Sequence, residues 1–377
     1  MSDLLSPRSG IRLDDTQRLA WLRLVRSESV GPATFRDLIN YFGTASAALD
    51  ALPDLAARAK SGKRITIASE DQAAQELEAL SQLNGQVICL GEPDYPAALR
   101  AVDAPPPVIS VIGNPMIFAE NTVAFVGSRN ASLSGIKLTG QLASETGKSG
   151  FATVSGLARG IDAAAHHASI ETGTIAVFAG GVDHIYPREN AELAQAIVAN
   201  SGAIVSEMPL GWQPRAQDFP RRNRIVAGIA LGLVVVEAAK RSGSLISARL
   251  ANEMGRIVFA VPGSPLDPRS EGANHLIKQG ATLITSARDI VETLSPLRDI
   301  NMQSAYTLEE GERQPLDANP SDSERQRLID ALDRTPVHVD EIVRFTNIEA
   351  ANLHMLLLEL DLAGRLERHP GNKVSII

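Results

Sequence analysis

Several loops of this chain combine glycine, serine and arginine in the way that phosphate-binding loops do. The clearest is Gly127-Ser128-Arg129, which directly follows the apolar run ending at Val126. Glycine lets backbone amides approach an anion, the N-terminus of the following helix adds partial positive charge, and arginine can hold phosphate through two hydrogen bonds. This loop is therefore predicted to bind phosphate, and a tight turn with a surface arginine is the alternative.

A second loop repeats this arrangement with Ser155, Gly156 and Gly160. Asp162 can cap the helix that follows, and His166, one turn later, can pair with it. The favoured interpretation of His166 is a histidine packed under a sheet, because no nucleophile and no metal-ligand spacing accompanies it. The three loop residues are predicted to bind phosphate.

The third and fourth loops add aromatic rings to the basic residues. In the third loop, Tyr186 and Arg188 combine a ring with a charge, which is the pairing that holds single-stranded nucleic acid. In the fourth, Phe219 precedes one helical turn with the further candidates Arg221, Arg222, Asn223 and Arg224. A solvated arginine face, or arginines that pair with carboxylates and hold loops together, is the alternative.

The fifth loop follows an apolar run that ends at Glu237, and it contains Lys240 and Ser242-Gly243-Ser244. Serine and glycine at a helix N-terminus form a nest of amides that can bind an anion. Glu237 is expected to orient Arg224 or another arginine rather than to act on a ligand.

The basic residues gather locally in a chain that is acidic overall. The formal net charge is -8, whereas residues 214–241 hold six Lys or Arg and two Asp or Glu. The net charge therefore argues against a protein that coats duplex DNA by charge alone, and a defined polyanion site is expected. Aromatic residues make up only 4% of the chain, so base stacking would depend on a few rings.

Several motifs that would indicate an enzyme are not present. The segment from Gly140 to Ser149 resembles a P-loop, but Leu142 stands where a glycine is required. The chain has no G-x-G-x-x-G, H-x-x-x-H, C-x-x-C or G-x-S-x-G motif. Cys89 is the sole cysteine, which rules out a disulfide framework. No catalytic residue, metal or cofactor is predicted.

The elements that must position these loops alternate between buried strands and amphipathic helices. The predicted strands are Val87–Leu90, Val108–Ile112, Val123–Val126, Ala152–Val154, Ile175–Phe178, Ala203–Ser206, Leu233–Val236 and Ile257–Val261. The predicted helices are Ser134–Lys148, Ile161–Thr172, Asn190–Asn200, Leu245–Met254 and Ala287–Glu292. This alternation predicts an α/β fold with a Rossmann-like, mostly parallel sheet over residues 85–295. Ligands of such sheets bind at the carboxyl ends of the strands, where all five loops are expected.

The two ends of the chain predict smaller modules. Residues 1–84 read as a helical domain of the helix-hairpin-helix (SAM-like) type, with its turn at Gly31-Pro32. Helix packing is the favoured role for this turn because few basic residues surround it. Residues 296–320 read as a polar linker. Residues 321–377 predict three helices and a β-hairpin that turns at Gly371-Asn372, which is a winged-helix pattern.

Charge argues against DNA reading by the C-terminal module. It holds seven Lys or Arg and ten Asp or Glu, and its third helix carries Glu349, Glu359 and Asp361. An acidic helix does not enter a major groove easily, so protein interaction is the expected role. The N-terminus does not read as a signal peptide, and the apolar run Ile225–Val236 is too short to span a bilayer. A cytoplasmic protein is therefore expected.

The combination of motifs resembles the DprA family, also called Smf, whose members process DNA in natural transformation. The matching segments are Tyr95-Pro96 with Leu99 and Pro105-Pro106, Val126–Arg129, Ser155–Asp162 with Ala165-His166, Tyr186-Pro187, Phe219–Ile225, Ser242–Leu245, Ala260–Gly263, and Gly272–Asn274 with Leu276-Ile277 and Gly280-Ala281. The resemblance runs from the hairpin near Gly31 to the terminal wing.

This resemblance implies a protein that binds and protects incoming single-stranded DNA and helps to load the RecA recombinase. It also implies a homodimer that forms through the Rossmann-like domain. The family's DNA contacts match Arg129 and the basic position after Tyr186-Pro187, which is Arg188 here and lysine in several relatives. Arginine keeps the charge of lysine but changes the hydrogen-bond geometry.

Two other functions are weighed against this one. A nucleotide-processing enzyme of the phosphoribohydrolase type has a related sheet and a PGGxGTxxE stretch. The segments nearest to that stretch, Ala179–Asp183 and Lys240–Ser244, lack its glutamate. An interaction scaffold that works mainly through the winged helix is the third hypothesis, and it is compatible with the first.

Overall fold

The computed structural model describes residues 10–58, 65–298, 320–369 and 371–377. Contacts divide the chain into two compact units. The sheet unit contains Glu76–Pro105 and the segment that begins at Ile109, whereas the helical unit joins Ile11–Gln75 to the C-terminal segment that ends at Ile377. No helix in the described part of the chain is both long and apolar enough to cross a membrane.

The sheet unit is built on nine strands in the order β1-β2-β6-β5-β4-β3-β7-β8-β9. Their bounds are β1 Gly85–Cys89, β2 Val108–Gly113, β3 Thr122–Val126, β4 Ala152–Ser155, β5 Thr174–Val177, β6 Ala203–Ser206, β7 Gly232–Val235, β8 Ile257–Ala260 and β9 Thr282–Leu283. The pairs from β6 to β9 are parallel, and β2 pairs antiparallel with β6. The prediction of a Rossmann-like, mostly parallel sheet is confirmed, and each predicted strand is present within two residues of its expected ends.

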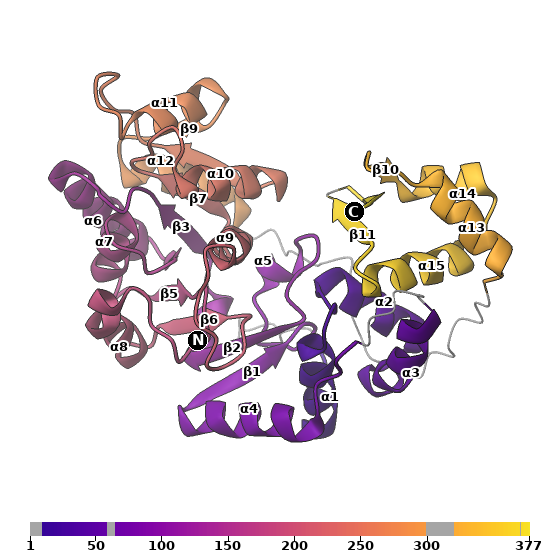
Figure 1. Ribbon diagram of the computed structural model, residues 1–377. Helices are drawn as coiled ribbons and strands as arrows, with labels where there is room; N and C mark the ends of the chain where they lie inside the picture. Colours follow the sequence, from indigo (N-terminus) through magenta and orange to yellow (C-terminus); the bar gives the residue numbers. More distant parts are fainter. Residues whose placement is uncertain (1–9, 59–64, 299–319, 370) are drawn as a thin grey trace. The chain divides into compact units, whose positions relative to one another are not determined.

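Helices cover both faces of this sheet (Figure 1). Their bounds are α5 Ala97–Arg100, η1 Pro115–Ala119, α6 Leu133–Lys148, α7 Ile161–Ala168, η2 Arg188–Asn190, α8 Ala191–Ala199, α9 Asp218–Ile229, α10 Gly243–Glu253, α11 Glu271–Lys278, α12 Ala287–Leu294 and η3 Ser295–Leu297. One apolar core joins β3, β7 and β8 to α6, α7 and α12, with Phe125, Phe151 and Phe259 fully buried. Helices α9 and α10 pack together and belong to the other face.

One predicted helix is shorter than expected. The expected helix Ile161–Thr172 ends at Ala168, because Ser169 caps it and its hydroxyl bonds back to the carbonyl of Ala165. The chain then turns at Gly173, whose φ of 102° suits glycine. The sequence patterns predicted α9 only in part, as one helical turn at Arg221–Arg224 and a helix end near Ile225, and they missed α11 and the two-residue strand β9.

The strand order places a crevice beside β3. From β3 the chain runs outward through β4, β5 and β6 on one side, and it then returns to β7 on the other side of β3. Connections therefore diverge at the carboxyl ends of β3 and β7, which is the switch point where open α/β sheets bind ligands. The loops after Val126 and Val235 both open at this point.

The helical unit contains helices from both ends of the chain. Its N-terminal helices are α1 Asp15–Arg26, α2 Pro32–Phe42 and α3 Ala45–Arg58, and α4 Glu70–Gln82 leads from this unit into the sheet unit. The side chain of Asp14 caps α1, and Gly31 precedes Pro32 at the start of α2. This is the helix-hairpin-helix arrangement that the Gly31-Pro32 turn predicts.

The C-terminal segment has the predicted winged-helix form. Its elements are α13 Asp322–Ala331, β10 Val337–His338, α14 Val339–Thr346, α15 Ala350–Leu362, β11 Leu366–His369 and β12 Lys373–Ile376. The strands form a sheet in the order β10-β12-β11, and Ser321 caps α13 in a capping box. Most of the predicted linker 296–320 lies outside the described residues.

Candidate nucleic-acid interface

Arg129 and two aromatic rings lie together at the carboxyl edge of the sheet. The guanidinium carbon of Arg129 is 5.1 Å from the centroid of the Phe219 ring, and the rings of Phe219 and Tyr186 have centroids 5.6 Å apart. Arg129 is exposed, Tyr186 is 48% exposed, and no ion pair among the described residues involves Arg129. An exposed cation that is stacked on rings presents both charge and a flat apolar face.

A cavity of about 460 Å³ opens beside this cluster, at the switch point of the sheet. Its walls come from the loop after β3, the loop after β4, helix α9 and the start of α10. The predicted residues that line it are Gly127, Ser128, Arg129, Phe219, Arg222, Asn223, Ser242, Gly243 and Ser244. A smaller adjoining pocket adds Gly156 and Tyr186 and shares Arg129, Phe219 and Arg222. Four of the five predicted loops therefore meet in the cavity, and the third reaches the adjoining pocket.

Arg222 forms the floor shared by both pockets. The residue is only 6% exposed, and its Nε has no hydrogen-bond partner among the described residues. The guanidinium lies directly over Gly156, where the Cβ of any other residue would be 1.2 Å from Nη1. Glycine is therefore required at position 156 because Arg222 occupies the space of a side chain.

Asp162 lies close enough to Arg222 for the two charges to act on each other. Burial raises the pKa of Asp162 and lowers the pKa of Arg222, and attraction between the two opposes both shifts. The carboxylate accepts hydrogen bonds from the backbone amides of Gly156 and Ala158 at 3.2 and 3.3 Å. The expectation that Asp162 caps the following helix is therefore wrong: it holds the preceding loop, and Gly160 occupies the N-cap position.

Two other predicted glycines allow the first and second loops to pack against each other. A Cβ on Gly127 would be 2.6 Å from the side chain of Ile161, and one on Gly160 would be 2.2 Å from the carbonyl oxygen of Ser128. Gly160 also has a φ of 77°, which is unfavourable for other residues. The backbone amide of Ile161 donates to the oxygen of Ser128 at 3.3 Å. These glycines fix the loop that carries Arg129.

Arg221 and Arg224 are held by a carboxylate that the sequence patterns did not single out. Glu207 lies directly after β6, is 7% exposed, and contacts Nε of Arg221 at 2.8 Å and Nη2 of Arg224. Arg224 also donates to the carbonyl of Ala104 at 3.2 Å. The signal that could have found Glu207 is an acidic residue at the end of a buried strand. Its effect is to orient α9, which carries Phe219 and Arg222.

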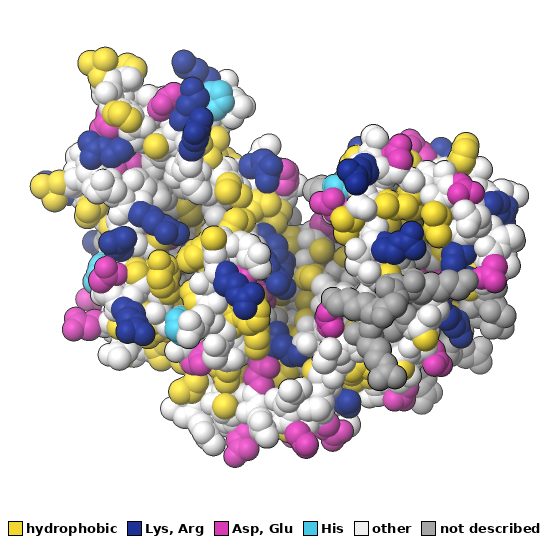
Figure 2. Space-filling view, in the orientation of Figure 1, with side chains coloured by type: hydrophobic (Ala, Val, Ile, Leu, Met, Phe, Trp, Pro, Cys, Tyr) yellow, Lys and Arg dark blue, Asp and Glu magenta, His cyan; other side chains and the backbone are white. Residues whose placement is uncertain are grey.

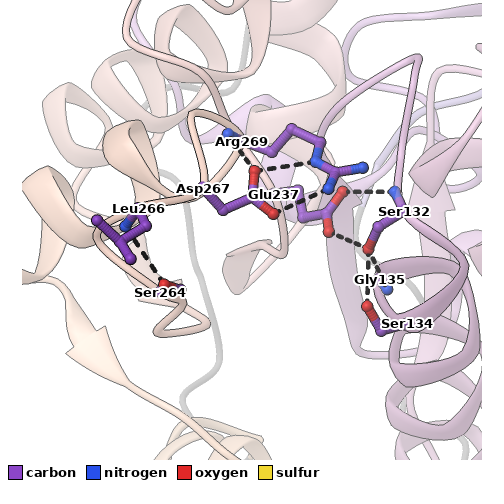
Figure 3. Close-up of polar contacts among 8 residues, drawn as sticks. All are labelled: Ser132, Ser134, Gly135, Glu237, Ser264, Leu266, Asp267 and Arg269. Atoms are coloured by element: carbon purple, nitrogen blue, oxygen red, sulfur yellow. Dashed lines mark hydrogen bonds and ion pairs between the residues drawn. The ribbon is translucent and has the colours of Figure 1, made fainter.

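Glu237 was expected to orient Arg224 or another arginine, but Arg224 pairs with Glu207 instead. The charge of Glu237 acts on Arg269, with no direct hydrogen bond between the two among the described residues. The carboxylate of Glu237 accepts the backbone amide and the hydroxyl of Ser132 at 2.9 and 2.5 Å (Figure 3). Ser132 is the N-cap of α6 and accepts the amide of Gly135. In the same view, Arg269 is held by both oxygens of Asp267 at 2.9 and 3.0 Å. The hydrogen bonds of Glu237 therefore connect the start of α6 to the loop directly after β7.

The fifth loop presents the N-terminus of α10 to the cavity. Ser242 is the N-cap, and its hydroxyl accepts the backbone amide of Ser244 at 3.3 Å. A Cβ on Gly243 would meet no atom within 4 Å, so the backbone there is open to a ligand. Arg241 lines the same cavity and was missed as a candidate, although it directly precedes the cap. The predicted segment therefore does form a helix N-terminus, and its binding of an anion stays a prediction.

Some predicted residues lie outside the two pockets. Arg188 is exposed in the turn η2 and lines neither of them, and Lys240 forms an ion pair with Glu271 at 3.3 Å. Ser155 is fully buried, and its hydroxyl donates to the carbonyl of Phe125 at 2.6 Å. Ser155 therefore connects two strands, whereas Arg188 remains available at the rim.

His166 is the buried histidine that was expected. It is fully buried, and its Nδ1 lies 2.7 Å from the hydroxyl of Thr174 rather than beside Asp162. Burial and the nearby charge of Arg222 lower the pKa of His166 to about 3. The neutral ring is therefore part of the folded core.

We expect a pH dependence of stability from this histidine. The pKa of His166 in the folded state lies below its unfolded value of about 6.5. The contribution of the neutral ring to the free energy of unfolding is therefore complete above pH 6.5, and it is lost as the pH falls toward 3. The free energy of unfolding should fall by about 1.4 kcal/mol per pH unit below pH 6.5 through this group. Urea unfolding at pH 7.5 and 5.0 would measure it. A His166→Asn variant with the same fall as wild type would contradict this assignment.

Basic and apolar side chains are mixed on the visible face of the sheet unit. Figure 2 shows Lys and Arg side chains interspersed with hydrophobic ones there, without a continuous field of positive charge. This agrees with the formal net charge of -8. Three arginines, Arg129, Arg222 and Arg241, line the cavity where the loops meet, which suits a defined site for a polyanion.

The fold and the site define a Rossmann-like protein with an arginine-, serine- and glycine-lined cavity at the carboxyl edge of its sheet, flanked by helix-hairpin-helix and winged-helix modules. Family models match all three parts: DNA recombination-mediator protein A over residues 86–295, the DprA-like N-terminal HHH domain over 15–79, and the DprA winged helix domain over 312–372. The chain belongs to the DprA/Smf family.

Named relatives and solved structures agree with this assignment. Protein Smf of Synechocystis is 33% identical over 95% of this chain and 98% of its own length, and DNA processing protein DprA of Bacillus subtilis is 41% identical over 61% and 78%. The X-ray structure of DNA processing protein A (DprA) from Streptococcus pneumoniae is 37% identical in sequence and has a TM-score of 0.55. The match covers 59% of this chain and 77% of that chain. DNA processing protein A of Helicobacter pylori, described for its single-stranded DNA binding mode, is 29% identical with a TM-score of 0.51, covering 56% and 96%.

Proposed function

We propose that this chain is a single-stranded DNA-binding recombination mediator that acts in DNA-mediated transformation. The observation that carries the proposal is the cluster of exposed Arg129 with the rings of Phe219 and Tyr186 beside a cavity. A relative of known structure is described for binding single-stranded DNA. Rings can stack on unpaired bases, which a duplex does not offer, and arginine holds the phosphates between them.

The proposed DNA contacts fall into two groups. Arg129, Arg188 and Arg241 supply exposed positive charge, and Ser242-Gly243-Ser244 supplies backbone amides at the start of α10. Tyr186 and Phe219 supply rings. Arg221, Arg222, Arg224, Lys240, Ser155 and the loop glycines contribute mainly by holding these groups in place.

The comparison of single-stranded with duplex DNA tests this proposal. Fluorescence anisotropy with labelled oligo-dT and with a duplex of equal length should give at least tenfold tighter binding to the single strand. The affinity should fall linearly with the logarithm of salt concentration, because phosphate binding releases counterions. Equal affinity for both forms of DNA would contradict the proposal.

Family membership supports the finer parts of the proposal. The chain protects incoming DNA, helps to load RecA, performs no catalytic reaction, and works in the cytoplasm as a homodimer through its Rossmann-like domain. Its domains are residues 1–84, 85–295 and 321–377, with a linker at 296–320. Faster assembly of RecA on oligo-dT at limiting RecA concentration would support the loading role, and unchanged assembly would contradict it.

A further inference from the structure

The third helix of the winged-helix segment is buried on more than one side. The apolar core of that segment contains Leu353, Leu356, Leu357 and Leu360 of α15. Three other apolar residues of α15 lie outside this core, and each is 2% exposed: Met355, Leu358 and Leu362. Their spacing of three and four residues places them on one stripe of the helix. Another part of the helical unit must cover this stripe.

The N-terminal helices are in the right place to cover it. Helix α15 packs against α2 and α3, and the two segments belong to one compact unit although more than 240 residues separate them in sequence. Thr34 on α2 is 3% exposed, and its hydroxyl donates to Asp361 Oδ2 at 2.9 Å. The packing of α15 and this hydrogen bond both indicate that the N-terminal helices cover the stripe.

Charged side chains close the contact at its edge. Arg368 on β11 donates from Nε to Asp361 at 2.8 Å, and its Nη2 lies 2.7 Å from Asp37 on α2. Glu359, the other acidic residue within α15, is 2% exposed and pairs with Arg325 on α13 at 2.9 Å. Two of the three acidic residues that argued against DNA reading, Glu359 and Asp361, are therefore occupied in pairs with the protein's own groups, whereas Glu349 is exposed at the start of α15.

We propose that the winged helix is a docking module for the chain's own N-terminal helices, with the outer stripe of α15 as its binding surface. In helix-turn-helix proteins the corresponding helix enters the major groove. Here the same face holds α2 and α3, so the module joins the two ends of the chain and does not read duplex DNA. The inference is independent of the DNA site on the sheet unit.

Hydrogen exchange on the full chain tests this docking from both sides of the contact. Asp37→Arg places a second cation beside Arg368, so amide exchange in α15 should rise at least tenfold while α13 keeps its protection. Leu358→Asp places a charge in the stripe without touching the winged-helix core, so exchange in α2 should rise at least tenfold. Phe345→Asp is the matched control, because Phe345 is 82% exposed on α14.

The outcomes separate the possibilities. If amide exchange in α15 is as slow in Asp37→Arg as in the wild type, the proposal is overturned. This result decides the question even where Leu358→Asp unfolds the whole winged helix. Slower exchange of α15 when a 30-base-pair duplex is added to the wild type would overturn the proposal as well, because that result would place DNA on the helix. Unchanged exchange of α15 with the duplex and faster exchange in both variants would support it.

Discussion

Replacing Arg129 with alanine should weaken binding to oligo-dT by about 10- to 100-fold. Arg129 is exposed and stacked on Phe219, and none of the described ion pairs occupies it, so its charge is free for a phosphate. A hydrogen bond to a charged group contributes about 1.5–3 kcal/mol, which corresponds to that change in affinity. Losing one phosphate contact should also reduce the salt slope by about 0.7. Anisotropy titrations at several salt concentrations measure both quantities.

A second arginine provides the control for net charge. Arg249 is exposed on α10, and its one ion pair among the described residues is with Glu253 along the helix, at 3.6 Å, so Arg249→Ala removes the same charge away from the site. Arg129→Lys should fall between wild type and Arg129→Ala, since lysine keeps the charge but loses the planar fork. If Arg129→Ala and Arg249→Ala bind within twofold of each other, Arg129 is not a DNA contact.

Replacing Glu207 with glutamine should destabilise the sheet unit by about 3 kcal/mol. The carboxylate is buried and contacts both Arg221 and Arg224, so its neutralisation leaves two cations near a third, Arg222. Removing one partner of a buried ion pair is strongly destabilising because the remaining charge loses its compensation. For a domain of about 200 residues, this corresponds to a fall in melting temperature of roughly 6–12 °C.

The same substitution at an exposed site provides the control. Glu253→Gln breaks the surface pair with Arg249 and should change stability by less than about 1 kcal/mol. Thermal unfolding of both variants and the wild type makes the comparison. A melting temperature of Glu207→Gln within 2 °C of that of Glu253→Gln would show that Glu207 does not hold α9 in place.

Local patterns were enough to predict the Rossmann-like sheet. Its strands are short, continuous apolar runs such as Val123–Val126, and buried parallel strands require this composition. The winged-helix segment was predictable for similar reasons, since Ser321 caps α13 and the chain turns at Asn372 with a φ of 56°. The antiparallel pairing of β2 was not predictable, because a strand's direction relative to its neighbour depends on the path of the chain between them.

The candidate site was predictable as a set of loops but not as a set of roles. The rule that ligands bind at the carboxyl ends of parallel strands placed Gly127, Phe219 and Ser242 at one edge before any contact was known. It could not tell that Arg222 would be buried over Gly156 while Arg129 stayed exposed. The two arginines lie on different elements, the loop after β3 and helix α9, and the burial of each depends on segments that only the fold brings against it.

By itself, the sequence determined the types of the elements, the edge of the sheet where charge gathers, and the acidic character of the winged helix. These properties depend on residues close together in the chain, through periodicity, capping and composition. Only the tertiary structure decided that Glu207 holds two arginines, that Glu237 binds Ser132, and that α15 packs on α2 and α3. Each of these contacts joins residues that are far apart in sequence, so it exists only once the chain is folded.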